Sequence, residues 1–87
     1  MTEADPFAAL ADANRRRLME ALRDGPKTVN ELASALPVSR PAVSQHLKAL
    51  LDARLVSVRA EGTRRWYSIG GPGLTRLNLW LDQFWQA

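Results

Sequence analysis

Residues 28 to 50, TVNELASALPVSRPAVSQHLKAL, contain two consecutive helix signals. Thr28 and Glu31 have the T-x-x-E spacing of a capping box, in which each side chain satisfies a free backbone amide at the start of a helix. Pro37 disfavours helical backbone in the residue before it, so this helix is expected to end at or before Leu36. The first signal therefore predicts a short helix with a defined start and a defined end.

The second helix signal follows directly. Ser39 can cap a helix with its side chain, and Pro41 is tolerated in the first turn because amides there have no intrahelical partner. This helix is expected to run to about Ala53. Two short helices with a tight connection at Pro37-Val38 predict a helix-turn-helix, whose second helix can enter the major groove of DNA.

The second helix has a polar face that suits base reading. With Val43 at zero and ~100° per residue, Ser44, Gln45 and Lys48 fall at roughly 100° to 200°. Arg40 lies in the first turn, where its long side chain can swing past the helix end. Glutamine pairs bidentately with adenine and arginine with guanine, whereas serine takes either role. An ordinary solvated face is the alternative. The apolar stripe on the other side consists of Val43, Leu47, Leu50 and Leu51.

His46 is the only histidine of the chain and flanks this apolar stripe. We expect it to pack or to give one hydrogen bond to a DNA phosphate rather than to read a base, and we count it among the DNA contacts. Catalysis or metal binding is disfavoured because the sequence shows no evident partner for it.

After the second helix the hydrophobic period changes from 3.6 to 2. Residues 55–59 and 64–69 predict two strands joined by a turn at 60–63, in which Gly62 permits the reversal. Basic side chains near a hairpin tip can follow phosphates or enter a narrow minor groove. This hairpin is therefore the expected wing, and its DNA contacts are Arg59, Arg64 and Arg65, although Arg59 could instead pair with Glu61. The strand residues expected on one apolar face are Val56, Val58, Tyr67 and Ile69.

The ends of the chain add further helices. Asp5-Pro6 suits a helix start, Asp12 can cap a second helix, and residues 74–85 resume a helical pattern after a glycine-rich break. The last segment carries an apolar arc of roughly 140°, more than one thin core layer requires, and such aromatic patches usually mark an interface. We therefore expect a twofold dimer through the first and last helices. The expected interface residues are Phe7, Leu10, Leu77, Trp80, Leu81 and Phe84.

Composition limits the other classes of function. The chain has 87 residues and no cysteine, which excludes a disulfide, a thiolate zinc site and a cysteine nucleophile within it. A single domain over residues 1–87 is expected, and its thin core favours self-association. No apolar run approaches the length of a membrane span and no signal-peptide layout is present, so a soluble cytoplasmic protein is expected.

Positive charge is concentrated in the middle of the chain. The net charge is +3, but residues 39–67 carry six basic and two acidic side chains, a net of +4, whereas residues 1–38 carry five and six, a net of −1. If the central residues share a face, this distribution is typical of a polyanion binder. The run Arg15-Arg16-Arg17 lies outside this region and is expected to be a solvated helix face, with contact to DNA phosphates as the alternative.

Residues 37–50, PVSRPAVSQHLKAL, resemble the recognition region of the ArsR-type bacterial winged-helix repressors. Residues 7–12, 15–18, 55–69 and 73–85 are also similar to that family. The resemblance implies a homodimeric transcriptional repressor whose outer helices form the interface. Its base and phosphate contacts correspond to Arg40, Ser44 and Gln45, with wing contacts near Arg64.

The chain departs from the metal-sensing relatives at their sensing positions. Where those relatives carry a Cys-x-Cys pair, this sequence has Thr28 and Asn30, and Asp82 of the last helix stands without the histidine ligands that others use. The pattern is more similar to the metal-free members, so neither a metal nor a cofactor is expected.

The fold class expected is mainly α with a β-hairpin wing (α+β), with about five helices and two strands. The favoured function is a dimeric winged-helix repressor that binds double-stranded DNA at an inverted-repeat operator. The alternative is a winged helix that serves as a protein-interaction module. An enzyme is disfavoured because the sequence shows no paired carboxylates in a plausible cleft, no Walker-type phosphate loop and no base beside a nucleophile.

Overall fold

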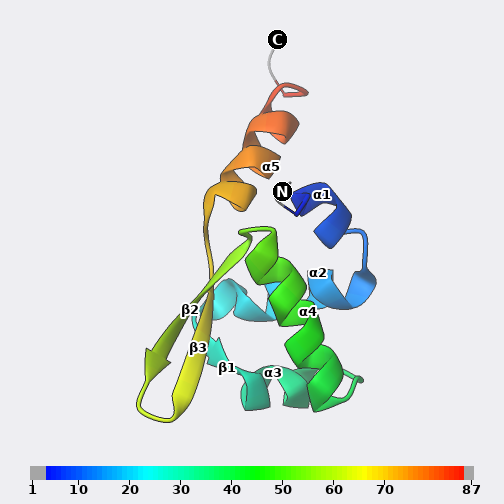
Figure 1. Cartoon of the computed structure of the whole chain (residues 1–87). Helices are drawn as coiled ribbons and strands as arrows, with labels where there is room; N and C mark the ends of the chain where they lie inside the picture. Colours follow the sequence, from blue (N-terminus) through cyan, green and yellow to red (C-terminus); the bar gives the residue numbers. More distant parts are fainter. Residues whose placement is uncertain (1–3, 86–87) are drawn as a thin grey trace.

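The computed structural model describes residues 4–85 and confirms the winged helix-turn-helix (Figure 1). Within these residues the structure has three strands where two were expected, because a two-residue strand precedes the helix-turn-helix. The helices are α1 (Pro6–Ala9), α2 (Ala13–Ala21), the 3₁₀ helix η1 (Leu22–Asp24), α3 (Val29–Ala35), α4 (Arg40–Asp52) and α5 (Pro72–Asp82). The strands are β1 (Lys27–Thr28), β2 (Val56–Glu61) and β3 (Arg64–Ile69).

The predicted helix starts are confirmed by side-chain caps. Asp5 accepts a hydrogen bond from the backbone N–H of Phe7 at 2.9 Å, and Asp12 accepts one from that of Asn14 at 2.8 Å. The capping box of α3 is complete in both directions, and α4 begins at its Ser39 cap. These caps satisfy amides that have no partner inside the helix, which fixes where each helix begins.

The sheet is antiparallel in the order β1-β3-β2. Glu61 pairs with Arg64, so β2 runs two residues further than predicted and the turn consists only of Gly62 and Thr63. Gly62 has a φ of 63°, which glycine adopts without steric cost. The third strand was missed because β1 contains two residues and shows no period.

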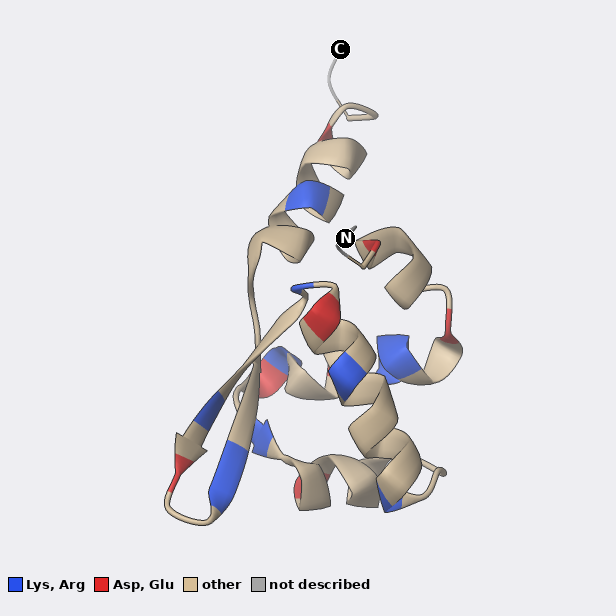
Figure 2. Cartoon of the chain, viewed as in Figure 1, with Lys and Arg blue, Asp and Glu red and all other residues tan. Residues whose placement is uncertain are grey.

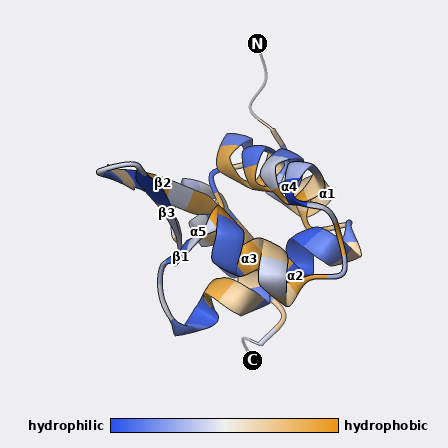
Figure 3. Ribbon diagram, turned by 90° about the horizontal axis from the view of Figure 1, so that it is seen from below, coloured by the Kyte–Doolittle hydropathy of each residue, from blue (hydrophilic) through white to orange (hydrophobic). Residues whose placement is uncertain are grey.

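The core is centred on α4, which packs against α1, α2, α3 and β2. Val43, Leu47 and Leu50 are fully buried, as the helical angle predicted, and Leu51 lies at the edge of the core. Val58 shares a face with Tyr67 but is exposed, because the hairpin projects beyond the core that covers its base (Figure 3). The expected apolar face of the hairpin is therefore buried only near the body of the protein.

Helix α5 starts two residues earlier than predicted and lies over the end of α4. The N–H of Gly73 donates to the carbonyl of Arg54 at 3.0 Å, and a Cβ at Gly73 would collide with the carbonyl oxygen of Ala53. Helix α5 also contacts α1. These two helices occupy one end of the molecule, whereas the hairpin turn and the start of α4 occupy the other (Figure 1).

Candidate nucleic-acid interface

The polar face predicted on α4 is exposed. Ser44, Gln45 and Lys48 are all open to solvent, whereas the neighbouring Val43 and Leu47 are fully buried. This difference follows from the helical period, because anchoring one side of α4 in the core turns the other side outward. The side chains on the outer side have the donors and acceptors that base edges and phosphates require.

Lys48 forms an ion pair with Asp52, one turn further along α4. Its Nζ lies 3.1 Å from Oδ2 of Asp52, and both side chains are more than half exposed. An exposed pair of this kind contributes at most about 1 kcal/mol. Lys48 can therefore exchange Asp52 for a DNA phosphate at little cost.

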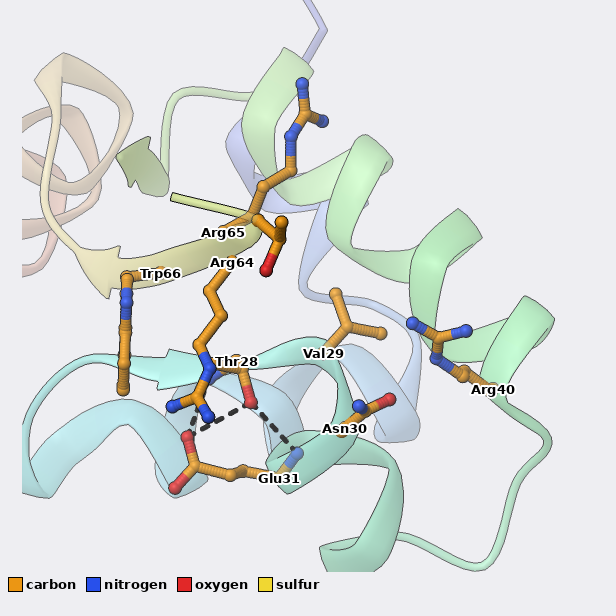
Figure 4. A pocket seen from close by; sticks show the side chains of 9 residues that line it. Thr28, Val29, Asn30, Glu31, Arg40, Arg64, Arg65 and Trp66 are labelled. Carbon is orange, nitrogen blue, oxygen red and sulfur yellow. Dashed lines mark hydrogen bonds between the residues drawn. The ribbon is translucent and has the colours of Figure 1, made fainter. Parts of the chain in front are cut away.

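The wing arginines lie on different faces of the hairpin. Arg59 pairs with Glu61 at 3.4 Å, the arrangement considered as its alternative role. Arg64 extends toward Glu31 of α3, whereas Arg65 points away from it (Figure 4). Successive residues of a strand alternate and residues paired across the hairpin share a face, so Arg59 and Arg64 lie on one face and Arg65 on the other. Figure 2 shows basic residues along the hairpin and on α4, together with acidic residues on both elements.

A hollow of about 490 Å³ separates the wing from the starts of α3 and α4 (Figure 4). It brings Arg40 of α4 together with Arg64 and Arg65 of β3, three residues that the sequence assigned to DNA contact. Trp66 also lines it and was not predicted as a functional residue, because the pairing of β3 with β1 that places it there is not a local signal. The remaining lining residues are Thr28, Val29, Asn30, Glu31 and Thr63.

Glu31 makes the charge of this hollow mixed. The backbone N–H of Thr28 donates to its carboxylate at 2.9 Å, and this bond, followed by that from the Thr28 hydroxyl, holds the pKa of Glu31 below its ordinary value. Lys27 and Arg64 lower the pKa further. Glu31 therefore remains ionised, and Arg64 faces an anion while no DNA is present.

His46 has a partner that the sequence did not reveal. Its Nδ1 accepts a hydrogen bond from Nε of Arg15 at 3.3 Å, and both residues are half-buried. Arg16 donates to the carbonyl of Leu10 at 2.7 Å. The expectation that residues 15–17 form a solvated face is confirmed for Arg16 and Arg17, which are exposed, but not for Arg15, which is half-buried against His46.

The aromatic residues expected at the dimer interface form one cluster. The ring of Trp80 contacts Phe7 edge to face at a centroid distance of 5.3 Å and Phe84 at 4.9 Å. Trp80 is 49% and Phe84 58% exposed, and Phe7 and Leu81 are exposed as well. We call Phe7, Trp80, Leu81 and Phe84 the aromatic patch. It lies on α1, α5 and the turn that follows α5.

Two other residues of the expected interface lie inward. Leu77 is only 8% exposed and belongs to the protein's own core, and Leu10 is half-buried against that core. Leu79 and Trp85 are also exposed but were not predicted to form the interface. Periodicity defined the apolar stripe of α5 but not which of its members the rest of the chain covers.

Neither a metal-binding cluster nor a membrane-spanning helix is found within residues 4–85. No group of three or more His, Cys, Asp or Glu side chains there is arranged to hold a metal ion. None of the helices in that range has both the length and the apolar character needed to cross a membrane.

Comparisons with known proteins connect this geometry to a family. The family model described as bacterial regulatory protein, arsR family, matches residues 12–58. The HTH-type transcriptional regulator Rv2034 of Mycobacterium tuberculosis is 58% identical over 91% of this chain and 74% of its own length. A probable mercury resistance operon repressor of Streptomyces lividans is 38% identical over 87% of this chain and 61% of its own.

Solved structures agree in fold over almost the whole chain. A possible transcriptional regulator for arsenical resistance superposes with a TM-score of 0.83 at 42% identity, covering 95% of this chain and 86% of the other. The homodimeric winged helix-turn-helix DNA-binding domain Mb0332 of Mycobacterium bovis has a TM-score of 0.76 at 32% identity, covering 93% and 75%.

Proposed function

The chain belongs to the ArsR family of bacterial regulatory proteins, and from this premise we propose that it represses transcription by binding double-stranded DNA as a homodimer. One observation carries the proposal: Ser44, Gln45 and Lys48 are exposed on α4, at the side opposite its buried stripe. A helix-turn-helix with a wing presents such a face to the major groove. The chain acts as one domain, in the cytoplasm, and performs no chemistry on its ligand.

Base reading and backbone contact are divided among the residues of this surface. Ser44 and Gln45 read base edges, because their short polar side chains can both donate and accept hydrogen bonds. Lys48, Arg40 and the wing arginines contact phosphates and fix the register of the protein on the duplex. The hollow between α4 and the wing receives one backbone strand, whose phosphates replace Glu31 as the partner of Arg64.

Dimerisation sets the form of the operator. The aromatic patch lies at the end of the molecule away from the hairpin turn, so two copies joined there leave both α4 helices free. A twofold axis places them in successive major grooves about 34 Å apart, which matches an inverted repeat. A dimer on such a site blocks access of the polymerase.

Selection of bound sequences from a random duplex library tests this function. We expect an enriched inverted repeat with half-sites one helical turn apart. On that site the logarithm of the affinity should fall with the logarithm of the salt concentration at a slope near −5, if ~6 phosphates are neutralised. No enrichment together with a flat salt dependence would favour a protein-interaction module instead.

Two substitutions separate base reading from phosphate contact. Gln45→Ala should cost about 1 to 3 kcal/mol on the preferred base and relax selectivity at one position of the half-site. Lys48→Ala should weaken binding to all sequences alike and reduce the salt slope by about one. Arg76→Ala, which removes an exposed charge from α5, is the matched control. An unchanged preferred site in Gln45→Ala would exclude Gln45 as a base reader.

A further inference from the structure

Arg15 connects the recognition helix with the first helix of the fold. Its Nε donates to Nδ1 of His46 on α4 at 3.3 Å, and its Nη1 donates to the carbonyl of Ala9 on α1 at 3.5 Å. Arg15 and His46 are 31 positions apart and both half-buried. A single side chain in the first turn of α2 thus contacts α1, which carries part of the aromatic patch, and α4, which carries the polar face.

Asp12 holds the start of this connection in place. Its carboxylate caps α2 by accepting the backbone N–H groups of Asn14 and Arg15. The bond from the Arg15 amide is the main cause that lowers the pKa of Asp12, and the bond from the Asn14 amide lowers it further. Asp12 therefore stays ionised beside the Arg15 and His46 pair.

The hydrogen bond from Arg15 determines which nitrogen of His46 carries the proton. A guanidinium has only donors and is never deprotonated in proteins, so Nδ1 of His46 must act as an acceptor. In a neutral imidazole one nitrogen accepts and the other donates. The proton of His46 is therefore on Nε2.

Nε2 of His46 is not completely buried. Within residues 4–85, every buried polar side-chain atom has a hydrogen-bond partner. Nε2 of His46 has no hydrogen-bond partner among those residues. It must therefore be accessible. His46 stands between the exposed Gln45 and the buried Leu47, at the edge of the polar face of α4.

We propose that Arg15 is a positioning residue for DNA binding: it holds His46 in the tautomer whose Nε2–H donates to a phosphate at the border of the major groove. This inference rests on the proposed function and assigns Arg15 a role that its position outside the basic middle of the chain did not suggest. An N–H group beside a groove-bound helix is a typical phosphate donor, and such contacts orient the helix on the duplex.

The tautomer can be measured without DNA. His46 is the only histidine, so the ring nitrogen signals of uniformly ¹⁵N-labelled protein belong to one residue. At a pH where the ring is neutral, we expect an acceptor-type Nδ1 and a protonated Nε2 in the wild type, and a mixture of tautomers in Arg15→Met. A protonated Nδ1 in the wild type would overturn the proposal, whether or not the protein binds DNA.

Substitutions of His46 separate its two nitrogens. His46→Gln places an amide N–H close to the position of Nε2, and His46→Asn places a carbonyl oxygen close to that of Nδ1. We expect His46→Gln to retain operator affinity within about threefold and His46→Asn to weaken it about tenfold, the effect of one hydrogen bond to a charged group. Arg15→Met leaves a mixture of tautomers, so it should weaken binding by about twofold, in proportion to the lost population of the Nε2–H form. Equal losses in the Gln and Asn variants would overturn the proposal.

The double variant tests whether Arg15 acts through His46. In the His46→Asn background, Arg15→Met should weaken binding no further than the matched control Arg16→Met, which removes an equal charge from the adjacent residue. A further tenfold loss would mean that Arg15 acts through its own charge or through stability, and would overturn the proposal. If circular dichroism shows that Arg15→Met is unfolded, the proposal is tested instead by the tautomer of the wild-type protein and by the operator affinities of the His46 variants. If the wild type selects no DNA sequence, the proposed function fails, while the tautomer result still stands separately.

Discussion

Trp80→Ala tests whether the aromatic patch joins two copies of the chain. Trp80 is 49% exposed although it contacts both Phe7 and Phe84. A tryptophan buries up to ~250 Å², so about 120 Å² of this side chain remains for a partner to cover. At ~25 cal/mol per Å² that area is worth about 3 kcal/mol, and a twofold dimer contains it twice. Complete coverage would therefore supply about 6 kcal/mol per dimer.

Sedimentation equilibrium over a wide range of protein concentration measures this effect. If the partner covers two thirds of the exposed area, the two Trp80 side chains contribute about 4 kcal/mol to the free energy of dimerisation. Trp80→Ala should therefore raise the dimer dissociation constant about a thousandfold. Circular dichroism verifies that the loss of the contacts with Phe7 and Phe84 leaves the subunit folded.

Leu79→Ala is the matched control for this experiment. Leu79 is 66% exposed, more than Trp80, but it lies about 180° around α5 from the centre of the apolar stripe. If the patch is the interface, this variant keeps the dimer. A wild-type protein that is monomeric throughout, or an equally tight Trp80→Ala dimer, would refute the assignment.

Two further substitutions test the fold. Gly73→Ala should lower the free energy of unfolding by about 1 to 3 kcal/mol in urea, because its Cβ collides with the carbonyl of Ala53 and α5 must shift; an unchanged midpoint would show that the contact is easily relieved. Backbone hydrogen bonds, chiefly from Arg15 and Thr28, lower the pKa values of Asp12 and Glu31 from 3.8 and 4.5. The ionised carboxylates therefore stabilise the folded state at a pH above those values. This stabilisation is lost as the pH falls through the lowered pKa values of the folded state. Asp12→Asn with Glu31→Gln should therefore lose less stability than wild type on acidification below about pH 4, and parallel pH profiles of stability would contradict this.

The elements that could be predicted are those encoded in neighbouring residues. Asp12 and Ser39 begin helices because a side-chain oxygen reaches an amide two or three positions away. The helical period likewise predicted that Leu47 would be buried and Gln45 exposed, since a fixed rotation per residue separates the two faces of α4. Such information is local, so the sequence contains it without reference to the rest of the chain.

The features that could not be predicted join residues far apart. Thr28 lies opposite Trp66 only because β1 pairs with β3, and this pairing also shapes the hollow near Arg64. The bond from Arg15 to His46 similarly requires the packing of α2 on α4. Neither residue type nor spacing along the chain indicates these contacts.

The sequence by itself therefore determined where the helices with side-chain caps begin, the polar and apolar sides of α4 and the presence of a wing. Only the tertiary structure decided that Leu77 is covered by the chain's own core while Trp80 remains open, and that Arg64 faces Glu31 of α3. The physical reason is that periodicity defines a face, whereas the partner that covers a face depends on how distant segments pack.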